Sequence, residues 1–250
     1  MKAITTKKPE EKKLNIAIVQ AYDDNIKSYA EYSRLLNAMY ARMHNYTYIC
    51  FEYDLVPVFV SVYYNKIIAV DSALKDQRNF DWVLYIDSDA AVSNFKYNIE
   101  EIVARHEGKE IIIAQDSNGV NNGVFLIKNT ERMKEFLNKS YADRNFYHTK
   151  TPEQSAMFHY LTTEYKDVVG VESPHHMNAY LNGYADLKST KEDVKNWDSD
   201  SFIVHLFQLA TEDRINIFKQ ILLANQIICI SKPKETSKIK PPVVNTAEKE

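Results

Sequence analysis

Glycine is scarce in this 250-residue sequence, and its scarcity excludes two common ways of binding phosphate groups. The five glycines stand at positions 108, 119, 123, 170 and 183. No pair of them fits the G-x-G-x-x-G pattern or the glycine-rich phosphate loop, in which backbone N–H groups surround the phosphates. If this chain binds a nucleotide, another group must neutralise the phosphate charge.

Long hydrophobic runs and an excess of basic charge are missing as well. The longest apolar runs are far shorter than the ~20 residues that a membrane-spanning helix needs. The opening segment MKAITTKKPEEKK is charged and lacks the apolar stretch of a signal peptide, so we expect no leader and no anchor. The net charge of −3 disfavours nucleic acid or an anionic membrane as the main partner, although it leaves room for local basic patches.

Cysteine occurs only twice, as Cys50 and Cys229, and both lie in apolar runs. This placement favours reduced thiols in the core over a disulfide framework. Together with the missing signal peptide, it predicts a cytoplasmic protein. The sequence gives no indication of the oligomeric state.

Apolar residues make up 45% of the chain, which is enough for a sizeable core, and their periodicity alternates between strand and helix. Strands are predicted at 14–22, 46–53, 82–86, 110–116, 123–129, 167–173 and 201–207. Helices are predicted at 25–45, 63–76, 97–107, 130–143, 152–165 and 211–230, with Thr130 as an N-cap. The pattern indicates one α/β domain over 14–230 with a mostly parallel sheet. The polar segments 1–13 and 231–250 are predicted to be disordered tails.

The strand at 82–86 runs into Asp87-Ser88-Asp89, and the same tripeptide recurs at 198–200. Because side chains in a strand alternate between faces, Asp87 and Asp89 are predicted to point to one face, where two carboxylates suit Mg²⁺ or Mn²⁺. In open α/β sheets, ligands bind outside the carboxyl ends of strands, where the first copy lies. The second copy precedes its strand and favours a turn. A turn is also the simpler interpretation of the first copy, so the motif alone leaves both readings open.

Each of the other polar candidates has an ordinary structural role as an alternative to a functional one. Residues 116–129, DSNGVNNGVFLIKN, could form a hairpin turn, or could present amides such as Asn122 to sugar hydroxyls. Glu153 and Gln154 lie in the first turn of a predicted helix, where acids commonly complement the dipole. His205 lies inside an apolar strand, as a core histidine would. The adjacent His175 and His176 cannot be assumed to form one site.

Five motifs follow one another in a fixed order. They are WVLYI-DSD (82–89), D-x-x-G-x-N-x-G-x-F-L-I-K-N (116–129), E-Q-S-A (153–156), M-N-A-Y (177–180) and F-I-V-H-L-F (202–207). In this order they resemble the galactosyl/xylosyl/mannosyltransferase family of the yeast mannan α-mannosyltransferase and plant xyloglucan xylosyltransferase type, glycosyltransferase family 34. The upstream YYNKIIAV (63–70) is similar to that family's aromatic-x-Lys segment, with Tyr64 in place of the usual Trp. The resemblance covers roughly residues 15–210.

The resemblance implies a GT-A, Rossmann-like nucleotide-diphospho-sugar transferase fold and a retaining transferase. Its donor would be a UDP-sugar or GDP-mannose bound through Mn²⁺ or Mg²⁺, and its acceptor a glycan or another hydroxyl compound. The residues implied in binding donor and metal are Gln20, Ala21, Tyr22, Lys66, Asp87, Ser88, Asp89 and His205. Among them Asp87, Asp89 and His205 would be the metal ligands. Asn122, Glu153 and Gln154 would line the sugar and acceptor site as catalytic residues.

The sequence departs from that family in two respects. A basic residue usually follows the histidine closely, but here HLFQLATEDR supplies none before Arg214. Relatives are usually Golgi membrane proteins with an N-terminal anchor, so this chain is expected to act in a cytosol-like compartment or to be a truncated relative. Two alternatives to sugar transfer remain: nucleotidyl transfer on a similar scaffold, and non-catalytic carbohydrate binding.

Overall fold

A six-stranded sheet forms the centre of the computed structural model, which describes residues 13–116, 119–181 and 197–225. Its strands are β1 (Ile16–Ala21), β2 (Thr47–Phe51), β3 (Trp82–Ile86), β5 (Ile111–Asp116), β6 (Gly119–Lys128) and β7 (Val169–Glu172). The strand order is β2-β1-β3-β6-β5-β7. Only β6 runs against its two neighbours, β3 and β5, so the predicted mostly parallel sheet is confirmed.

A second, two-stranded sheet pairs β4 (Ala90–Val92) with β8 (Ile203–His205) in antiparallel orientation. β8 is the core of the strand predicted at 201–207. The sequence did not predict β4, because three small apolar residues after a polar tripeptide form no recognisable period. β4 is nevertheless the element that brings the first Asp-Ser-Asp next to the end of β8.

Helices pack on both faces of the central sheet. They are α1 (Lys27–His44), α2 (Asn65–Leu74), α3 (Ile99–Arg105), α4 (Glu131–Ala142), α5 (Pro152–Thr162), α6 (Pro174–Met177) and α7 (Thr211–Ala224), with 3-10 turns at Val62–Tyr64, Arg144–Phe146 and Lys166–Val168. Each predicted helix is present, and α6 was not predicted. Thr130 caps α4 by accepting from the N–H of Met133, as expected. No described helix is long and apolar enough to cross a membrane.

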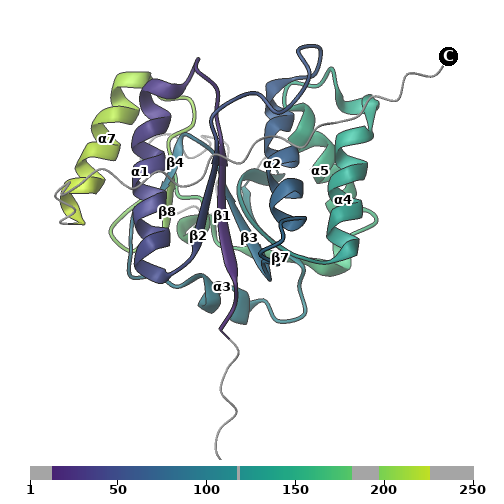
Figure 1. The fold of residues 1–250 in the computed structure, drawn as a ribbon, viewed down its shortest axis with the longest axis horizontal. Helices are drawn as coiled ribbons and strands as arrows, with labels where there is room; N and C mark the ends of the chain where they lie inside the picture. The colour runs from purple at the N-terminus through teal and green to yellow at the C-terminus, as the bar shows by residue number, and fades with distance from the viewer. Residues whose placement is uncertain (1–12, 117–118, 182–196, 226–250) are drawn as a thin grey trace, which may run out of the picture.

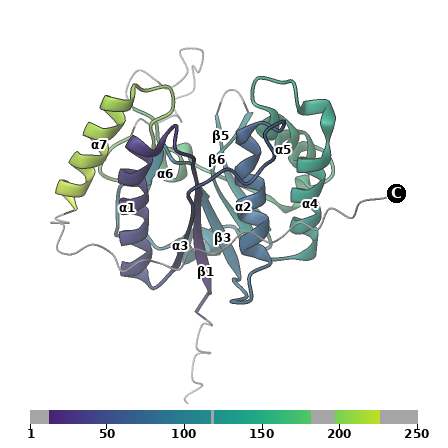
Figure 2. The ribbon, with the colours of Figure 1, turned by 45° about the horizontal axis from the view of Figure 1, so that its top comes forward.

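The alternating side chains of the strands separate the core into two parts. Along β3, Trp82, Leu84 and Ile86 pack into one cluster, whereas Val83 and Tyr85 pack into the other. In Figures 1 and 2, α1 and α7 lie on one side of β1, and α2, α4 and α5 lie on the other. Both faces of the sheet are therefore covered, which explains why β3 is apolar at every position.

The structure describes only part of the predicted tails and only one of the two cysteines. Cys50 is a free thiol on β2, and its burial raises its pKa to about 12. The described residues do not include Cys229, the predicted tail 231–250 or the last residues of the predicted helix 211–230. They also do not include residues 1–12 of the predicted N-terminal tail. The disorder of both tails therefore stays a prediction.

The carboxyl ends of β1, β2 and β3 meet at one edge of the sheet because these strands are parallel. The antiparallel β6 begins at the same edge, where the N–H of Asp87 donates to the carbonyl of Gly123 at 2.7 Å. β6 starts four residues earlier than predicted, so the predicted Asn-Gly loop belongs to this strand. The polar residues after β3 and those at the start of β6 thus lie side by side.

Candidate active site

The first Asp-Ser-Asp forms a tight turn directly after β3. The N–H of Ala90 donates to the carbonyl of Asp87 at 3.0 Å, which closes the turn. The explanation from strand alternation was therefore wrong, because the strand ends at Ile86. The hydroxyl of Ser88 donates to the carbonyl of Ala21 at 2.9 Å and ties the turn to the end of β1. Both acids still lie at the predicted carboxyl edge.

His205 joins the two acids because β8 pairs with β4 immediately after the turn. Ala90 lies opposite His205 in the small sheet, and the N–H of Leu206 donates to the carbonyl of Asp89 at 2.8 Å. The Nε2 of His205 lies 3.1 Å from Asp89 Oδ1. One ligand atom each from Asp87, Asp89 and His205 fits within 4.8 Å of the others. Two carboxylates and an imidazole are a donor set that suits Mn²⁺ or Mg²⁺.

A buried amide sets the orientation of the histidine ring. The Oδ1 of Asn178 lies 2.8 Å from Nδ1 of His205, and Asn178 is fully buried. An amide oxygen can only accept, so Nδ1 donates to Asn178, and Nε2 is the nitrogen that faces Asp89. Gly123 makes room beside this ring, since a Cβ there would clash with Cε1 of His205.

Lys66, from the first turn of α2, reaches the acid pair from the other face of the sheet. Its Nζ lies 3.1 Å from each carboxylate oxygen of Asp87 and 3.5 Å from Oε1 of Glu153. Burial lowers the pKa of Lys66, but these two carboxylates outweigh the burial and raise the pKa above its ordinary value. The lysine is therefore charged and fixed at neutral pH.

Arg214, from the first turn of α7, reaches the second acid. Its Nη2 donates to Oδ2 of Asp89 at 3.2 Å, and its Nε donates to the carbonyl of Leu206 at 3.0 Å. Burial raises the pKa of Asp89, but His205 and Arg214 more than offset it and hold the pKa below its ordinary value. Each aspartate of the pair thus faces one permanent cation.

Asn122 connects Lys66 to the start of α5. The amine of Lys66 donates to the side-chain oxygen of Asn122 at 3.2 Å, and the Asn122 amide donates to Oε1 of Glu153 at 3.4 Å. The backbone N–H of Asn122 donates to Oε1 of Gln154 at 3.3 Å. The other carboxylate oxygen of Glu153 is buried and has no hydrogen-bond partner among the described residues. The structure therefore brings all three predicted catalytic residues together beside Asp87.

The residues predicted to contact the nucleotide base lie at the end of β1. Gln20 is fully buried, and its amide nitrogen donates to Ser33 at 2.7 Å and to the carbonyl of Asp87 at 3.3 Å. Ala21 and Tyr22 are also buried. In this structure Gln20 supports the turn that carries the acids, and the base-binding role of the three residues stays a prediction.

The second Asp-Ser-Asp is a turn, as predicted. Oδ1 of Asp198 accepts from the N–H of Asp200 at 2.9 Å within its own tripeptide. The same oxygen lies 2.9 Å from Nε2 of His175, whereas Nδ1 of His176 lies 3.2 Å from Glu172. The two adjacent histidines therefore have separate partners and form no joint site.

A sequence model of the galactosyl transferase GMA12/MNN10 family matches residues 22–108 and 103–214. These segments include the acid turn, the histidine and both cations. This chain belongs to that family. It is therefore a glycosyltransferase, which decides for sugar transfer over nucleotidyl transfer and over non-catalytic carbohydrate binding. No curated protein sequence matches the chain significantly.

Solved structures support the GT-A fold of this glycosyltransferase. A glycosyltransferase involved in glycosylating the major capsid of PBCV-1 superposes with a TM-score of 0.68 at 18% identity, over 82% of this chain and 99% of that one. The galactosyltransferase LgtC, with donor and acceptor sugar analogues, gives 0.51 at 15% identity, over 83% and 95%. GlyE of Streptococcus pneumoniae TIGR4 gives 0.51 at 14% identity, over 86% and 64%.

Sequence reasoning assigned no role to three residues of the glycosyltransferase site: Gly123, Asn178 and Arg214. Asn178 was visible only as part of the M-N-A-Y motif, and Gly123 only as one of five glycines and as part of the motif at 116–129. Arg214 had a clear signal, because the expected basic residue after His205 was missing and this arginine is the first one downstream. The turn before α7 brings Arg214 back to the site.

Proposed function

We propose that this glycosyltransferase binds a divalent cation, Mn²⁺ or Mg²⁺, at Asp87, Asp89 and His205. With it the enzyme transfers a hexose or pentose from a nucleotide-diphosphate sugar to a hydroxyl of a glycan or other acceptor. The observation that carries the proposal is the compact donor set, in which Asn178 contacts Nδ1 of the histidine and Nε2 faces the acids. These residues fit a hard cation in both charge and donor type.

The bound cation would act as a Lewis acid for the negative charge that develops on the departing diphosphate. Lys66 and Arg214 hold positive charge on either side of the acid pair, and we assign them to binding the diphosphate oxygens. Fixed cations in a largely buried site stabilise developing charge without reorganising. Arg214 would then replace the basic residue that relatives carry soon after the histidine.

We propose that transfer retains the anomeric configuration and that Asn122, Glu153 and Gln154 line the sugar. Glu153 is the carboxylate of this group, and its second oxygen is buried without a hydrogen-bond partner among the described residues. Both a covalent route through Glu153 and a front-face displacement give retention. Nuclear magnetic resonance of the glycosidic product reports the anomer directly, and an inverted product would refute this assignment.

Removing either acid tests the metal site. Asp87→Ala and Asp89→Ala should each lower the rate of metal-dependent release of nucleoside diphosphate by about 10²-fold or more, because charge stabilisation of the leaving group is lost. Asp200→Ala, in the second Asp-Ser-Asp, is the matched control and should retain wild-type activity. Unchanged turnover in both acid variants would overturn the metal proposal. The donor, a UDP-sugar or GDP-mannose, and the predicted cytoplasmic location require a donor screen and localisation in cells.

A further inference from the structure

The loop between β2 and α2 ends in an exposed apolar tip. The N–H of Val60 donates to the carbonyl of Pro57 at 2.8 Å, which makes 57–60 a closed turn. Val58 and Phe59 occupy the two central positions of this turn, with relative exposures of 106% and 85%. Such positions are normally filled by glycine, asparagine or aspartate, so two large apolar residues there do not stabilise the turn itself.

The tip is held in place from below. Val56 and Val60, which flank it, are buried in the core beneath α2. Asn65 accepts from the N–H groups of Leu55 at 2.8 Å and Val56 at 3.1 Å, and its amide donates to Asp54 at 3.0 Å. The loop is therefore anchored at its base, and the exposure of its tip is part of the fold.

More apolar surface continues from the tip along the next turn. Val62 and Tyr63 are about half exposed, so four apolar side chains are exposed within six consecutive positions, and we call them the apolar tip: Val58, Phe59, Val62 and Tyr63. Contiguous exposed apolar surface of this kind marks a contact site. A tyrosine beside a valine and a phenylalanine also matches the amphipathic composition found at membrane–water interfaces.

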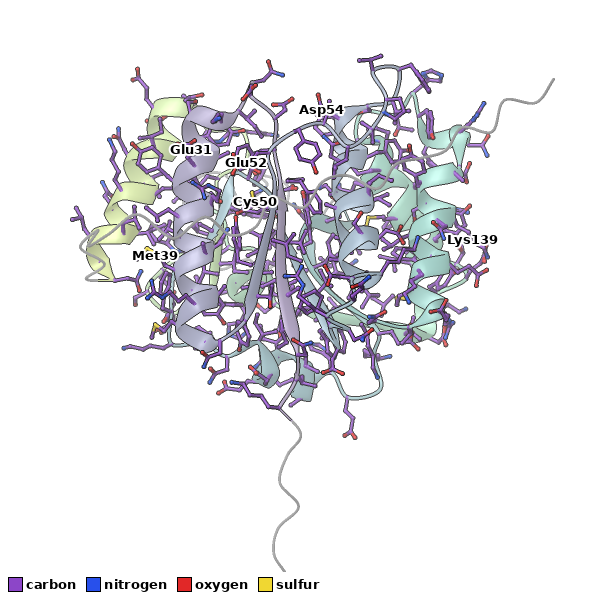
Figure 3. The ribbon with its side chains drawn as sticks, viewed as in Figure 1. Glu31, Met39, Cys50, Glu52, Asp54 and Lys139 are labelled. Carbon is purple, nitrogen blue, oxygen red and sulfur yellow. The ribbon has the colours of Figure 1, made fainter. Side chains whose placement is uncertain are left out.

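The apolar tip lies at the edge of the molecule that carries the active site. In Figure 1 the loop before α2 projects from the upper edge, to which β1 rises, and Figure 3 shows Asp54, at the loop's base, at this edge. The same chain segment continues through Asn65 to Lys66, which contacts Asp87 in the site. A surface that receives the tip therefore also faces the active-site edge.

The charges around the apolar tip match a lipid surface. The stretch 45–65 contains no lysine or arginine, and its charged residues, Glu52 and Asp54, precede the four uncharged residues of the tip. The segment 144–150 lies near the base of the same loop, since the ring of Tyr147 lies 5.1 Å from that of Tyr64, the buried residue that follows Tyr63. This segment exposes Arg144 and Lys150. An apolar point beside exposed cations complements a bilayer, which offers acyl chains below a layer of phosphate groups.

We propose that the apolar tip inserts into the headgroup region of a lipid bilayer and holds the active-site edge against the membrane surface. The convex shape of the tip favours a deformable bilayer over a rigid protein pocket. One short loop buries little area, so the attachment is weak and reversible. This inference is independent of the metal and donor, since vesicle binding needs neither.

Vesicle flotation tests the proposal with the full chain. The wild-type protein should float with phosphatidylcholine vesicles at millimolar lipid, and more of it should float when phosphatidylserine is added. Phe59→Ser should lower the floated fraction several-fold. Leu223→Ser is the matched control, because Leu223 is 75% exposed on α7, away from this loop, and its loss should change nothing. Both positions are exposed, so both variants should keep the wild-type melting temperature.

Three results would overturn the proposal. The first is wild-type protein that does not float, and the second is Phe59→Ser protein that floats as well as wild type. The third is a dimer in light scattering that Phe59→Ser converts to a monomer, which would assign the apolar tip to a protein interface.

Discussion

At the scale of single residues, the contacts of His205 distinguish a candidate metal ligand from an ordinary core histidine. His205 lies in an apolar strand and is 5% exposed, as a core histidine would be. Its contacts with Asp89 on one nitrogen and Asn178 on the other make it a candidate ligand instead. Asn178 is thus a positioning residue: it acts on the metal only through the ring that it holds.

Asn178→Ala should weaken Mn²⁺ binding by roughly 10- to 100-fold, the usual effect of losing a partner that orients a ligand. Isothermal titration calorimetry with Mn²⁺ alone measures this without turnover. Asn178→Asp keeps an acceptor oxygen at the same place and should recover much of the affinity. Equal affinities for the alanine variant and the wild type would show that the amide does not orient the ring.

At the scale of elements, one carboxylate joins α3, β7 and α6. Glu172, at the end of β7, accepts from Arg105 at 2.7 Å and lies 3.3 Å from His106 and 3.2 Å from His176. Burial raises the pKa of Glu172, but the hydrogen bonds from Arg105 and from the N–H of Ser173 outweigh it. The pKa falls from 4.5 to about 2.

This lowered pKa predicts a pH dependence of stability. A carboxylate whose pKa is lower in the folded state stabilises the fold above its unfolded pKa, and the contribution is lost as pH falls toward the folded value. Glu172 should therefore contribute about 3 kcal/mol at pH 7 and lose about 2 kcal/mol of it by pH 3. Urea denaturation at both pH values, on wild type and Glu172→Gln, measures the difference.

The exposed Glu107, next to the same helix end, supplies the control for that experiment. Glu107→Gln should follow the wild-type pH dependence, because no buried partner is lost. If Glu172→Gln and wild type lose the same free energy of unfolding between pH 7 and pH 3, the ion pairs of Glu172 do not stabilise the fold.

Element boundaries also show where local sequence information is sufficient. The strand Trp82–Ile86 was predicted with its observed bounds, because a run of apolar residues between polar ones defines a buried strand. β4 and α6 were not predicted, since three or four residues are too few to establish a period. Their existence depends on pairing with segments far away in the chain.

At the scale of the whole molecule, the active site combines residues from both parts of the core. Lys66 and Glu153 come from α2 and α5 on one side of the sheet, and His205 and Arg214 come from β8 and α7 on the other. A ligand that contacts all of them links the two sides. Binding should therefore stabilise the whole fold.

A correct nucleotide sugar together with Mn²⁺ should raise the melting temperature by roughly 5–10 °C at about 100 times its dissociation constant. Thermal shift measurements with UDP-sugars and GDP-mannose, with and without Mn²⁺, identify the donor. Arg214→Gln should reduce the part of the shift that depends on the donor. The shift that Mn²⁺ causes without a donor should not change. No shift with any donor would contradict the proposed binding of nucleotide sugars.

The sequence by itself determined the fold class, the strands and helices of clear period, and most of the residues that form the site. These follow from local patterns, because burial alternates with the period of each element, and from five motifs in a fixed order. Only the tertiary structure decided how the acid pair is directed and what surrounds it. Asp89 and His205 are 116 residues apart and meet through the pairing of β4 with β8. Such a contact depends on the packing of the whole chain, so no local pattern specifies it.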